Sequence, residues 1–463
     1  MKYYICIIAL ILVINGAISS KIGFNEGFNF ESTSGFKEDT FTNLINHFDT
    51  SDSSTYTQRF WYDAEKFDVK NGPIFLYICG EYVCSVNEER QFPVEVAKEN
   101  NGLFLYLEHR YYGESQPFEQ ATVENYQHLT SQHALADLAI FLTYVNDKVV
   151  QEHGGDKRKI IVVGGSYPGA LSAWFREKYP HIADASWASS AVVNAIDNYD
   201  LFDYQIWNST LRSSSYCTGT IQNLTLVYDR LVEQGNKAEL NKIKSAFGAE
   251  SLNDGDFAFY LADVFVGEVQ YGNRTVLCEF LESLAGVNIM EQYGRIAERY
   301  GDPGDAETYD RKYLKKDQII ISDASRAWLY QYCTEFGYFQ MPYQNLNMRS
   351  KLLGREYWDG LCQDVFGAEI RTLNRETNIH YGSIEGRESN TFLVNGGEDP
   401  WQWSGVLEST QSLNQIARLL QCENCGHCVE LYNEKDEDSQ ELKETRKQIK
   451  EWVNMILYGH LKY

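Results

Sequence analysis

The segment that decides the fold is Ile161-Val162-Val163-Gly164-Gly165-Ser166-Tyr167-Pro168-Gly169. A β-branched apolar run leads into two glycines, presents Ser166, and continues into the helix-forming residues 170–179. Glycines permit a tight turn where side chains would collide with neighbouring strands. This strand–turn–helix pattern predicts that Ser166 is a nucleophile exposed at the tip of the turn. The amide of Tyr167, at the start of the helix, is placed to stabilise an oxyanion.

The turn departs from the usual Gly-x-Ser-x-Gly spacing. Pro168 takes the last place of the pattern, and Gly169 follows it. Proline is accepted in a first helical turn, because an N–H there has no partner to lose. The competing interpretation is an ordinary strand-to-helix turn that contains a serine, and this segment by itself leaves both interpretations open.

Further apolar runs predict a buried, mostly parallel sheet. They cover residues 74–78, 103–107, 183–190 and 391–395, and a helical pattern over 134–142 precedes the serine turn. Alternation of buried strands with helices favours the α/β class. Residues 193–377 are helix-rich and aromatic instead. We therefore predict an α/β-hydrolase fold in which a helical cap at 193–377 interrupts a core made of 21–192 and 378–463.

The N-terminal residues predict entry into the secretory pathway. Lys2 precedes an apolar run over 5–14 that is too short to span a bilayer, so residues 1–20 have the pattern of a cleaved signal peptide. Sequons at Asn208, Asn223 and Asn273 predict glycosylation within the cap. The signal peptide starts the route and leaves a lysosomal, endosomal or extracellular destination open.

Charge and cysteine content exclude several classes of function. A net charge of −24 disfavours nucleic-acid partners, and it suits either an acidic compartment or simple solubility. No later run is apolar enough to cross a membrane. The spacing Cys422-x-x-Cys425-x-x-Cys428 lacks a free fourth ligand for zinc, so we expect disulfides or a free thiol there and no metal. After the signal the cysteine count is odd, which predicts one unpaired thiol.

A nucleophilic serine needs a base and an acid that orients it. In α/β-hydrolases the acid and then the histidine follow the serine along the chain. Asp399 comes directly after the run 391–395 and its glycine turn, with Glu398 as the rival acid. Only His427 and His460 follow Asp399, and His460 lies at the C-terminus. We therefore predict the triad Ser166, Asp399 and His427.

A set of motifs spread over nearly the whole mature chain extends this prediction. It comprises Gln58-Arg59-Phe60-Trp61, Gly72-Pro73-Ile74-Phe75, Glu108-His109-Arg110-Tyr111-Tyr112-Gly113-Glu114-Ser115, Gly164-Gly165-Ser166-Tyr167, Gln331-Tyr332-Cys333-Thr334-Glu335-Phe336-Gly337, Asn395-Gly396-Gly397-Glu398-Asp399-Pro400-Trp401 and Gly426-His427-Cys428. On these motifs the chain resembles the serine carboxypeptidase family that includes Pro-X carboxypeptidase, dipeptidyl peptidase II and the thymus-specific serine protease.

The resemblance implies a secreted or lysosomal serine-type peptidase that works through an acyl-enzyme, with specificity for proline next to the cut as one expectation. It implies the same triad and the same helical cap. The amides of Tyr167 and of the Gly80 region would form the oxyanion hole. Such an enzyme needs no cofactor, and its partners would be peptide substrates, with a homodimer left open. An esterase would use the same triad, and an inactive secreted binding scaffold would have no need of one.

Departures from the family narrow the subtype without deciding it. The carboxypeptidase branch has a second histidine and an arginine after its catalytic histidine, where this chain has Cys428 and Tyr432. The His-Cys pair is more similar to the thymus-specific branch.

Five further residues are substrate-binding candidates. A dipeptidyl peptidase needs an acid for the substrate amine, for which Asp323 and Glu335 are available, although an ordinary structural role is favoured for both. Glu81, Trp401 and Trp403 are candidates for lining the substrate pocket, with plain packing as the alternative for the aromatic pair.

Overall fold

The computed structural model describes residues 22–25, 27–30, 35–86 and 90–459, so the predicted signal peptide lies outside the described residues. One sheet of nine strands has the order β1-β2-β3-β5-β4-β6-β7-β8-β9. The strands are β1 (Gly23–Phe24), β2 (Lys37–Leu44), β3 (Thr55–Asp63), β4 (Ile74–Ile78), β5 (Leu103–Leu107), β6 (Ile160–Gly165), β7 (Ala185–Ser189), β8 (Thr391–Gly396) and β9 (Gln415–Leu420). The pairs from β5 through β9 are parallel, and β1 to β3 extend one edge antiparallel.

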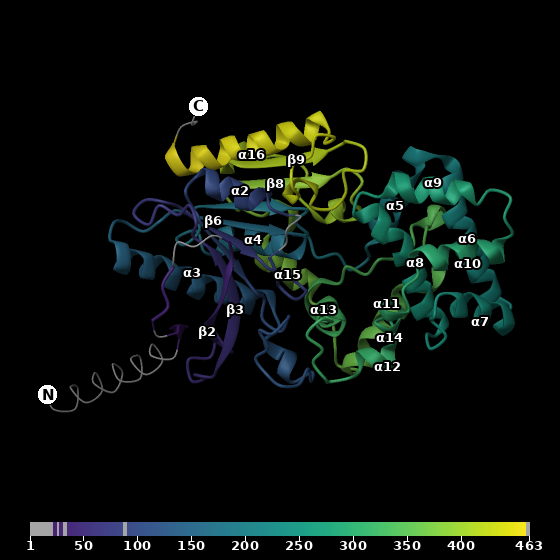
Figure 1. Cartoon of the computed structure of the whole chain (residues 1–463). Coiled ribbons are helices and arrows are strands. Elements are labelled where there is room, and N and C mark those ends of the chain that lie inside the picture. The colour runs from purple at the N-terminus through teal and green to yellow at the C-terminus, as the bar shows by residue number, and fades with distance from the viewer. Residues whose placement is uncertain (1–21, 26, 31–34, 87–89, 460–463) are drawn as a thin grey trace.

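Helices cover both faces of the sheet. They are α2 (Phe92–Glu99), α3 (Ser131–His153), α4 (Tyr167–Lys178) and α16 (Gln440–Tyr458). Figure 1 shows α16 and α2 on one side of the sheet and α3 on the other. Alternate residues of the parallel strands point to opposite faces. Leu105 packs in the cluster that includes α3 and α4, whereas Phe104 packs in the cluster with α2 and α16. The parallel strands are therefore buried on both faces, which explains their continuous apolar runs.

All elements between β7 and β8 are helices, and in Figure 1 most of them stand beside the sheet as a separate group. They include α5 (Asp200–Ser213), α6 (Ser215–Glu233), α7 (Lys237–Ala246), α8 (Asp254–Gln270), α9 (Arg274–Ser283), α10 (Ile289–Tyr300), α11 (Pro303–Glu307), α12 (Arg311–Leu314), α13 (Ser325–Gln331), α14 (Arg355–Phe366) and α15 (Asn374–Tyr381). The helical segment thus runs past residue 377, which was the predicted end of the cap. With this parallel sheet, the turn before α4 and the helical insertion, the chain has the α/β-hydrolase fold. No helix among the described residues is long and apolar enough to cross a bilayer.

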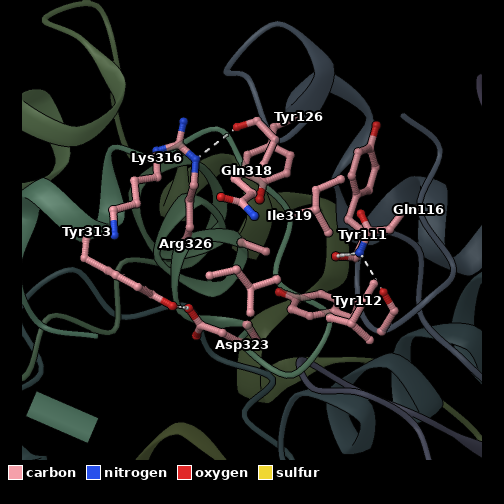
Figure 2. A pocket seen from close by; sticks show the side chains of 16 residues that line it. Tyr111, Tyr112, Gln116, Tyr126, Tyr313, Lys316, Gln318, Ile319, Asp323 and Arg326 are labelled. Atoms are coloured by element: carbon pink, nitrogen blue, oxygen red, sulfur yellow. Dashed lines mark hydrogen bonds between the residues drawn. The ribbon is translucent and has the colours of Figure 1, made fainter. Parts of the chain in front are cut away.

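The helical segment is tied to the core next to the loop that follows β5. Arg326 donates through Nε to the Ala121 carbonyl over 2.9 Å, and the Ala121 amide donates to the Asp317 carbonyl over 2.8 Å. Figure 2 shows a small cavity of about 30 Å³ at this junction, with Tyr111 on the core side and Arg326 on the cap side. These bonds hold α13 in place beside the sheet.

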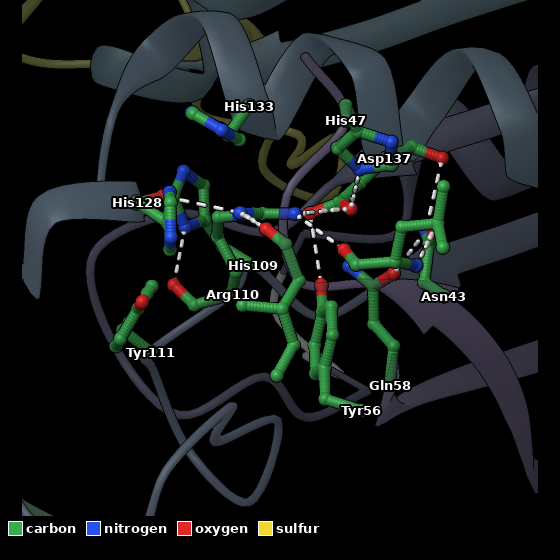
Figure 3. Close-up of polar contacts among 12 residues, drawn as sticks. Asn43, His47, Tyr56, Gln58, His109, Arg110, Tyr111, His128, His133 and Asp137 are labelled. Carbon is green, nitrogen blue, oxygen red and sulfur yellow. Dashed lines mark hydrogen bonds and ion pairs between the residues drawn. The ribbon is translucent and has the colours of Figure 1, made fainter. Parts of the chain in front are cut away.

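A buried ion pair joins three parts of the core. Arg110, just after β5, donates to both carboxylate oxygens of Asp137 on α3, over 2.6 and 2.7 Å. Tyr56 donates its hydroxyl to the same carboxylate over 2.8 Å, and His47 Nε2 lies 2.7 Å from it (Figure 3). Burial would raise the pKa of Asp137, but Arg110 outweighs burial and holds this pKa well below its usual range.

Replacing Asp137 by alanine should lower the free energy of unfolding by about 3–5 kcal/mol, because Arg110 would stay buried without its counter-charge. Urea denaturation measures the change. Asp147→Ala is the matched control on the same helix, since Asp147 is exposed and pairs only with exposed Lys157. The control should cost less than about 1 kcal/mol. Equal losses in the two variants would contradict a structural role for the buried pair.

Candidate active site

Ser166 lies at the tip of the turn between β6 and α4 in a strained backbone conformation. Its φ is 67° and its ψ is −129°, which is rare for a residue with a side chain. A Cβ on Gly164 would come within 2.1 Å of the Pro168 carbonyl oxygen, and one on Gly169 within 2.5 Å of the Ser189 oxygen. Only glycine fits at these two positions. The tight turn thereby presents the Ser166 side chain beyond the end of the sheet.

Pro168 packs against the end of β4. A Cβ on Gly80 would lie 2.4 Å from Pro168 Cγ, so the two residues are in close contact and Gly80 must lack a side chain. The proline that departs from the usual spacing therefore fits a glycine in the neighbouring loop.

The predicted acid and base are hydrogen-bonded to each other. Asp399 precedes the 3₁₀-helix η6 (Pro400–Ser404), and its Oδ2 lies 2.7 Å from His427 Nδ1. Its Oδ1 accepts the Trp401 amide over 2.9 Å, and the carboxylate is 0% exposed. The His427 amide donates to the Gln270 carbonyl over 2.6 Å, which fixes the loop. Burial alone would lower the pKa of His427, but the Asp399 carboxylate outweighs burial and raises this pKa above its ordinary value.

Ser166 and His427 line one cavity of about 610 Å³. Other residues of its lining are Gly80, Glu81, Arg90, Gln270, Tyr271 and Trp401. Among the described contacts there is no direct hydrogen bond between Ser166 and His427. In serine hydrolases without substrate this contact is often long, and it shortens when substrate binds. The cavity thus brings the predicted nucleophile and base to one space with the acid behind the base.

The predicted oxyanion donors stand at the same end of the sheet. Tyr167 is the first residue of α4, and the first amides of a helix have no partner within the helix. Gly80 follows β4 and lines the cavity. The N-terminus of α4 adds a partial positive charge near the serine.

Glu398, the rival acid, points away from His427. It receives two hydrogen bonds of 2.9 Å from Arg274 and an ion pair of 3.0 Å from Arg212. Both arginines come from the cap, so Glu398 ties the cap to the loop that carries Asp399. The carboxylates of Glu398 and Asp399 therefore have different partners, although the two residues are neighbours in the chain.

The five predicted substrate-binding residues are divided between different places. Glu81 and Trp401 line the cavity, and burial raises the pKa of Glu81. Trp403 is not in the lining and instead donates to Gln205 over 3.2 Å. Asp323 borders the small cavity of Figure 2, where it accepts from Tyr313 over 2.6 Å. Glu335 accepts from the Ser131 hydroxyl over 2.8 Å, and it is not in the lining either.

Cysteines and sequons have clear positions. The described disulfides are Cys79–Cys84, Cys217–Cys278, Cys333–Cys362 and Cys422–Cys425. Cys428 is a free, buried thiol, so the spacing at 422–428 holds one disulfide and one thiol. All three sequons lie in the cap, where Asn223 and Asn273 are exposed and Asn208 is half-buried.

Arg90 is a cavity residue that the sequence analysis missed. Its guanidinium donates to the Tyr432 hydroxyl over 3.1 Å and lies 4.9 Å from the centre of that ring. Its Nε is buried and has no hydrogen-bond partner in the part of the chain that the structure describes. Arg90 comes from a polar loop with no periodic pattern, so nothing in the sequence marks it. Gln270, at the end of α8, was also missed, although it accepts from the Trp401 indole over 3.1 Å.

Comparison with known proteins identifies relatives over most of the chain. A family model described as serine carboxypeptidase S28 matches residues 43–449. The probable serine protease EDA2 of Arabidopsis thaliana is 35% identical, covering 84% of this chain and 79% of its own. The human thymus-specific serine protease is 26% identical over a match that covers 90% of this chain and 87% of the relative. The mouse lysosomal Pro-X carboxypeptidase is 27% identical over a match that covers 79% of this chain and 78% of the relative.

Glu335 gives the protein a pH-dependent stability that can be measured. Burial raises the pKa of Glu335 to about 7, from 4.5 for a free glutamate. Between these values the unfolded chain ionises while the folded protein keeps the proton, so wild type should lose stability as pH rises through this range. The Tm of wild type minus that of Glu335→Gln should therefore fall between pH 4.5 and 7. Glu279 is exposed, so Glu279→Gln is the control. The Tm of wild type minus that of Glu279→Gln should not change with pH over this range. A Glu335→Gln offset that is constant or grows with pH would contradict the argument.

Proposed function

The chain belongs to the serine carboxypeptidase S28 family and is a serine-type peptidase, and we propose that Ser166, Asp399 and His427 are its catalytic triad. The observation that carries the proposal is the 2.7 Å bond between Asp399 and His427 at the wall of the cavity that also holds Ser166. The strained backbone of Ser166 supports it, because such strain persists where function requires it.

In the proposed reaction His427 Nε2 accepts the hydroxyl proton of Ser166 as Oγ attacks the peptide carbonyl carbon. Asp399 stays ionised and stabilises the imidazolium that forms. His427 then gives the proton to the leaving amine, and the C–N bond breaks to leave an acyl-enzyme. Water attacks the ester with His427 as base, which releases the acid product and restores Ser166.

The amides of Tyr167 and of the Gly80 region are the proposed oxyanion donors. Both belong to loops packed together through Pro168, so their separation is fixed before substrate arrives. Fixed donors need no reorganisation as charge develops on the carbonyl oxygen, and each donor is worth about a hundredfold or more in turnover.

For the substrate we propose a peptide with a free C-terminus. Arg90 supports this choice, because a guanidinium in the catalytic cavity can pair with a terminal carboxylate. It lies against Tyr432, the position at which the chain lacks the arginine of the carboxypeptidase branch. Recognition of a free N-terminal amine by an acid is the alternative, for which Glu81 is available in the same cavity.

Proline next to the cut remains part of the proposal. The name of the mouse relative, Pro-X carboxypeptidase, and the aromatic face of Trp401 in the cavity support it. The place of action that we propose is the secretory pathway, ending in lysosomes or outside the cell. Four disulfides among the described residues and relatives named as lysosomal or extracellular support this location.

The triad is tested with a fluorophosphonate probe and a panel of proline-containing peptides. Ser166→Ala should remove labelling and lower kcat/KM by at least about a thousandfold, because the attacking oxygen is lost. Ser172→Ala is the matched control on α4, the helix that begins directly after Ser166, since the Ser172 hydroxyl is buried and donates to the Gly169 carbonyl. The control should keep labelling and activity. Labelling that survives in Ser166→Ala would refute the assignment of the nucleophile.

Arg90→Gln should weaken binding of peptides with a free C-terminal carboxylate. We expect KM to rise by roughly tenfold to a hundredfold, the worth of a hydrogen-bonded charge pair. Peptides of the same sequence with an amidated C-terminus control for distortion of the cavity, and their KM should change little. An equal rise for both peptide series would mean that Arg90 only supports the structure, and faster cleavage of the amidated series by wild type would exclude carboxylate recognition.

A further inference from the structure

A second cavity of about 220 Å³ lies within the cap. Its walls are mainly aromatic, and the residues that matter here are Phe259 and Asp263 of α8, Trp328 of α13, Tyr332 of η2 (Tyr332–Phe336) and Tyr357 and Trp358 of α14. A volume of this size has room for a side chain of a ligand.

Asp263 is the only acidic residue of this lining, and its carboxylate is incompletely satisfied. Oδ2 accepts the Tyr309 hydroxyl over 2.9 Å, whereas Oδ1 is buried and has no hydrogen-bond partner among the described residues. Among the described residues Asp263 has no ion-pair partner either. A buried carboxylate oxygen without a partner is costly, so an unpaired oxygen at a cavity wall indicates a site for a donor.

Arg349 is the cation that acts on Asp263. Burial raises the pKa of Asp263 to about 6, although Arg349 and the Tyr309 hydroxyl both act in the opposite direction. Arg349 pairs through Nε with Asp203 at 3.3 Å and donates through Nη1 to the side chain of Gln340 over 3.0 Å, and its Nη2 is buried without a hydrogen-bond partner among the described residues. Arg349 is not part of the cavity wall, so the space in front of Asp263 holds no positive charge of the described protein.

Trp328 is common to the linings of this cavity and the catalytic one. The centre of its ring lies 4.8 Å from that of Tyr332 and 5.4 Å from that of Tyr167, the residue after the proposed nucleophile. The two cavities are therefore neighbours at Trp328.

We propose that this aromatic cavity is a subsite for a primary ammonium group of the substrate, which Asp263 Oδ1 binds. This proposal rests on the proposed peptidase function. Aromatic faces attract a cation and pack well against the methylenes that carry it. A guanidinium prefers two carboxylate oxygens at once, and Tyr309 already occupies one of them. The site therefore favours an ammonium over a guanidinium. Two sources share this chemistry: a lysine side chain and the free N-terminus of a peptide.

The test compares wild type with Asp263→Asn on peptides that contain either lysine or norleucine, each with a free or an acetylated N-terminus. Norleucine keeps the alkyl chain and lacks the charge. Wild type should favour the ammonium-bearing peptide by at least about tenfold in kcat/KM. Asp263→Asn should lose this preference while cleaving the uncharged, acetylated peptide as before.

The arms of the panel distinguish the two sources. A preference for lysine that survives acetylation assigns the ammonium to a side chain, and a preference abolished by acetylation alone assigns it to the N-terminus. Asp359→Asn is the matched control, because Asp359 is 45% exposed on α14 and its loss changes net charge equally. A preference that is absent in wild type, or unchanged in Asp263→Asn, overturns the proposal.

Binding to Ser166→Ala separates this proposal from the peptidase assignment. Trp328 and Trp358 line the cavity, so tryptophan fluorescence can report binding without turnover. The ammonium peptides should bind Ser166→Ala at least about tenfold more tightly than their uncharged partners, and the double variant with Asp263→Asn should bind both alike. If wild type cleaves none of the peptides but this difference is seen, the subsite stands and the proposed reaction fails. Equal binding by both variants overturns the subsite even if peptides are cleaved.

Discussion

The close contact between the first turn of α4 and the ends of the central strands determines the geometry of the site. Gly164 and Gly169 allow backbone to meet backbone there, and Gly80 accepts the ring of Pro168. Any Cβ at these positions would push α4 away from the sheet. Such a shift would move Ser166 and the Tyr167 amide together, because one turn carries both. The strained φ of Ser166 is tolerated because strands on either side over-determine its position.

Buried carboxylates are neutralised by a different partner at each position. Asp137 is paired with Arg110 for stability, Asp399 with His427 for the proposed chemistry, and Glu398 with Arg274 to attach the cap. Asp263 differs from these three, since among the described residues only the Tyr309 hydroxyl bonds to it and its Oδ1 has no hydrogen-bond partner. The contrast explains why a ligand is inferred at Asp263 and not at the others.

Patterns with strong periodicity were predictable from the sequence, and contacts between distant loops were not. The buried strands β4, β5, β6 and β8 matched their apolar runs. The strand β2 (Lys37–Leu44) was missed because its sequence KEDTFTNL is mostly polar, as its place in the antiparallel part of the sheet, next to the short edge strand β1, allows. The α/β-hydrolase prediction was confirmed.

The sequence predicted the order of the proposed triad residues along the chain, but only some of the residues that line the cavity. Asp399 was preferred over Glu398 from its position after the strand, and the ion pair with Arg274 gives the physical reason that Glu398 turns away. Trp401 and Trp403 looked equivalent, yet a 3₁₀ turn directs residues two apart to different sides. Arg90 and Asp263 reach their cavities only through tertiary packing, which no local pattern encodes.

The insertion of the cap between β7 and β8 also has a consequence for biosynthesis. Trp187 of β7 pairs with Phe392 of β8, so these neighbouring strands can join only after the whole helical segment between them has been made. Asp399 and His427 both follow β8 in the chain. A ribosome therefore releases the serine and its turn long before their partners exist. During synthesis the nascent polypeptide therefore carries the proposed nucleophile for more than 200 residues before the proposed acid and base are both made.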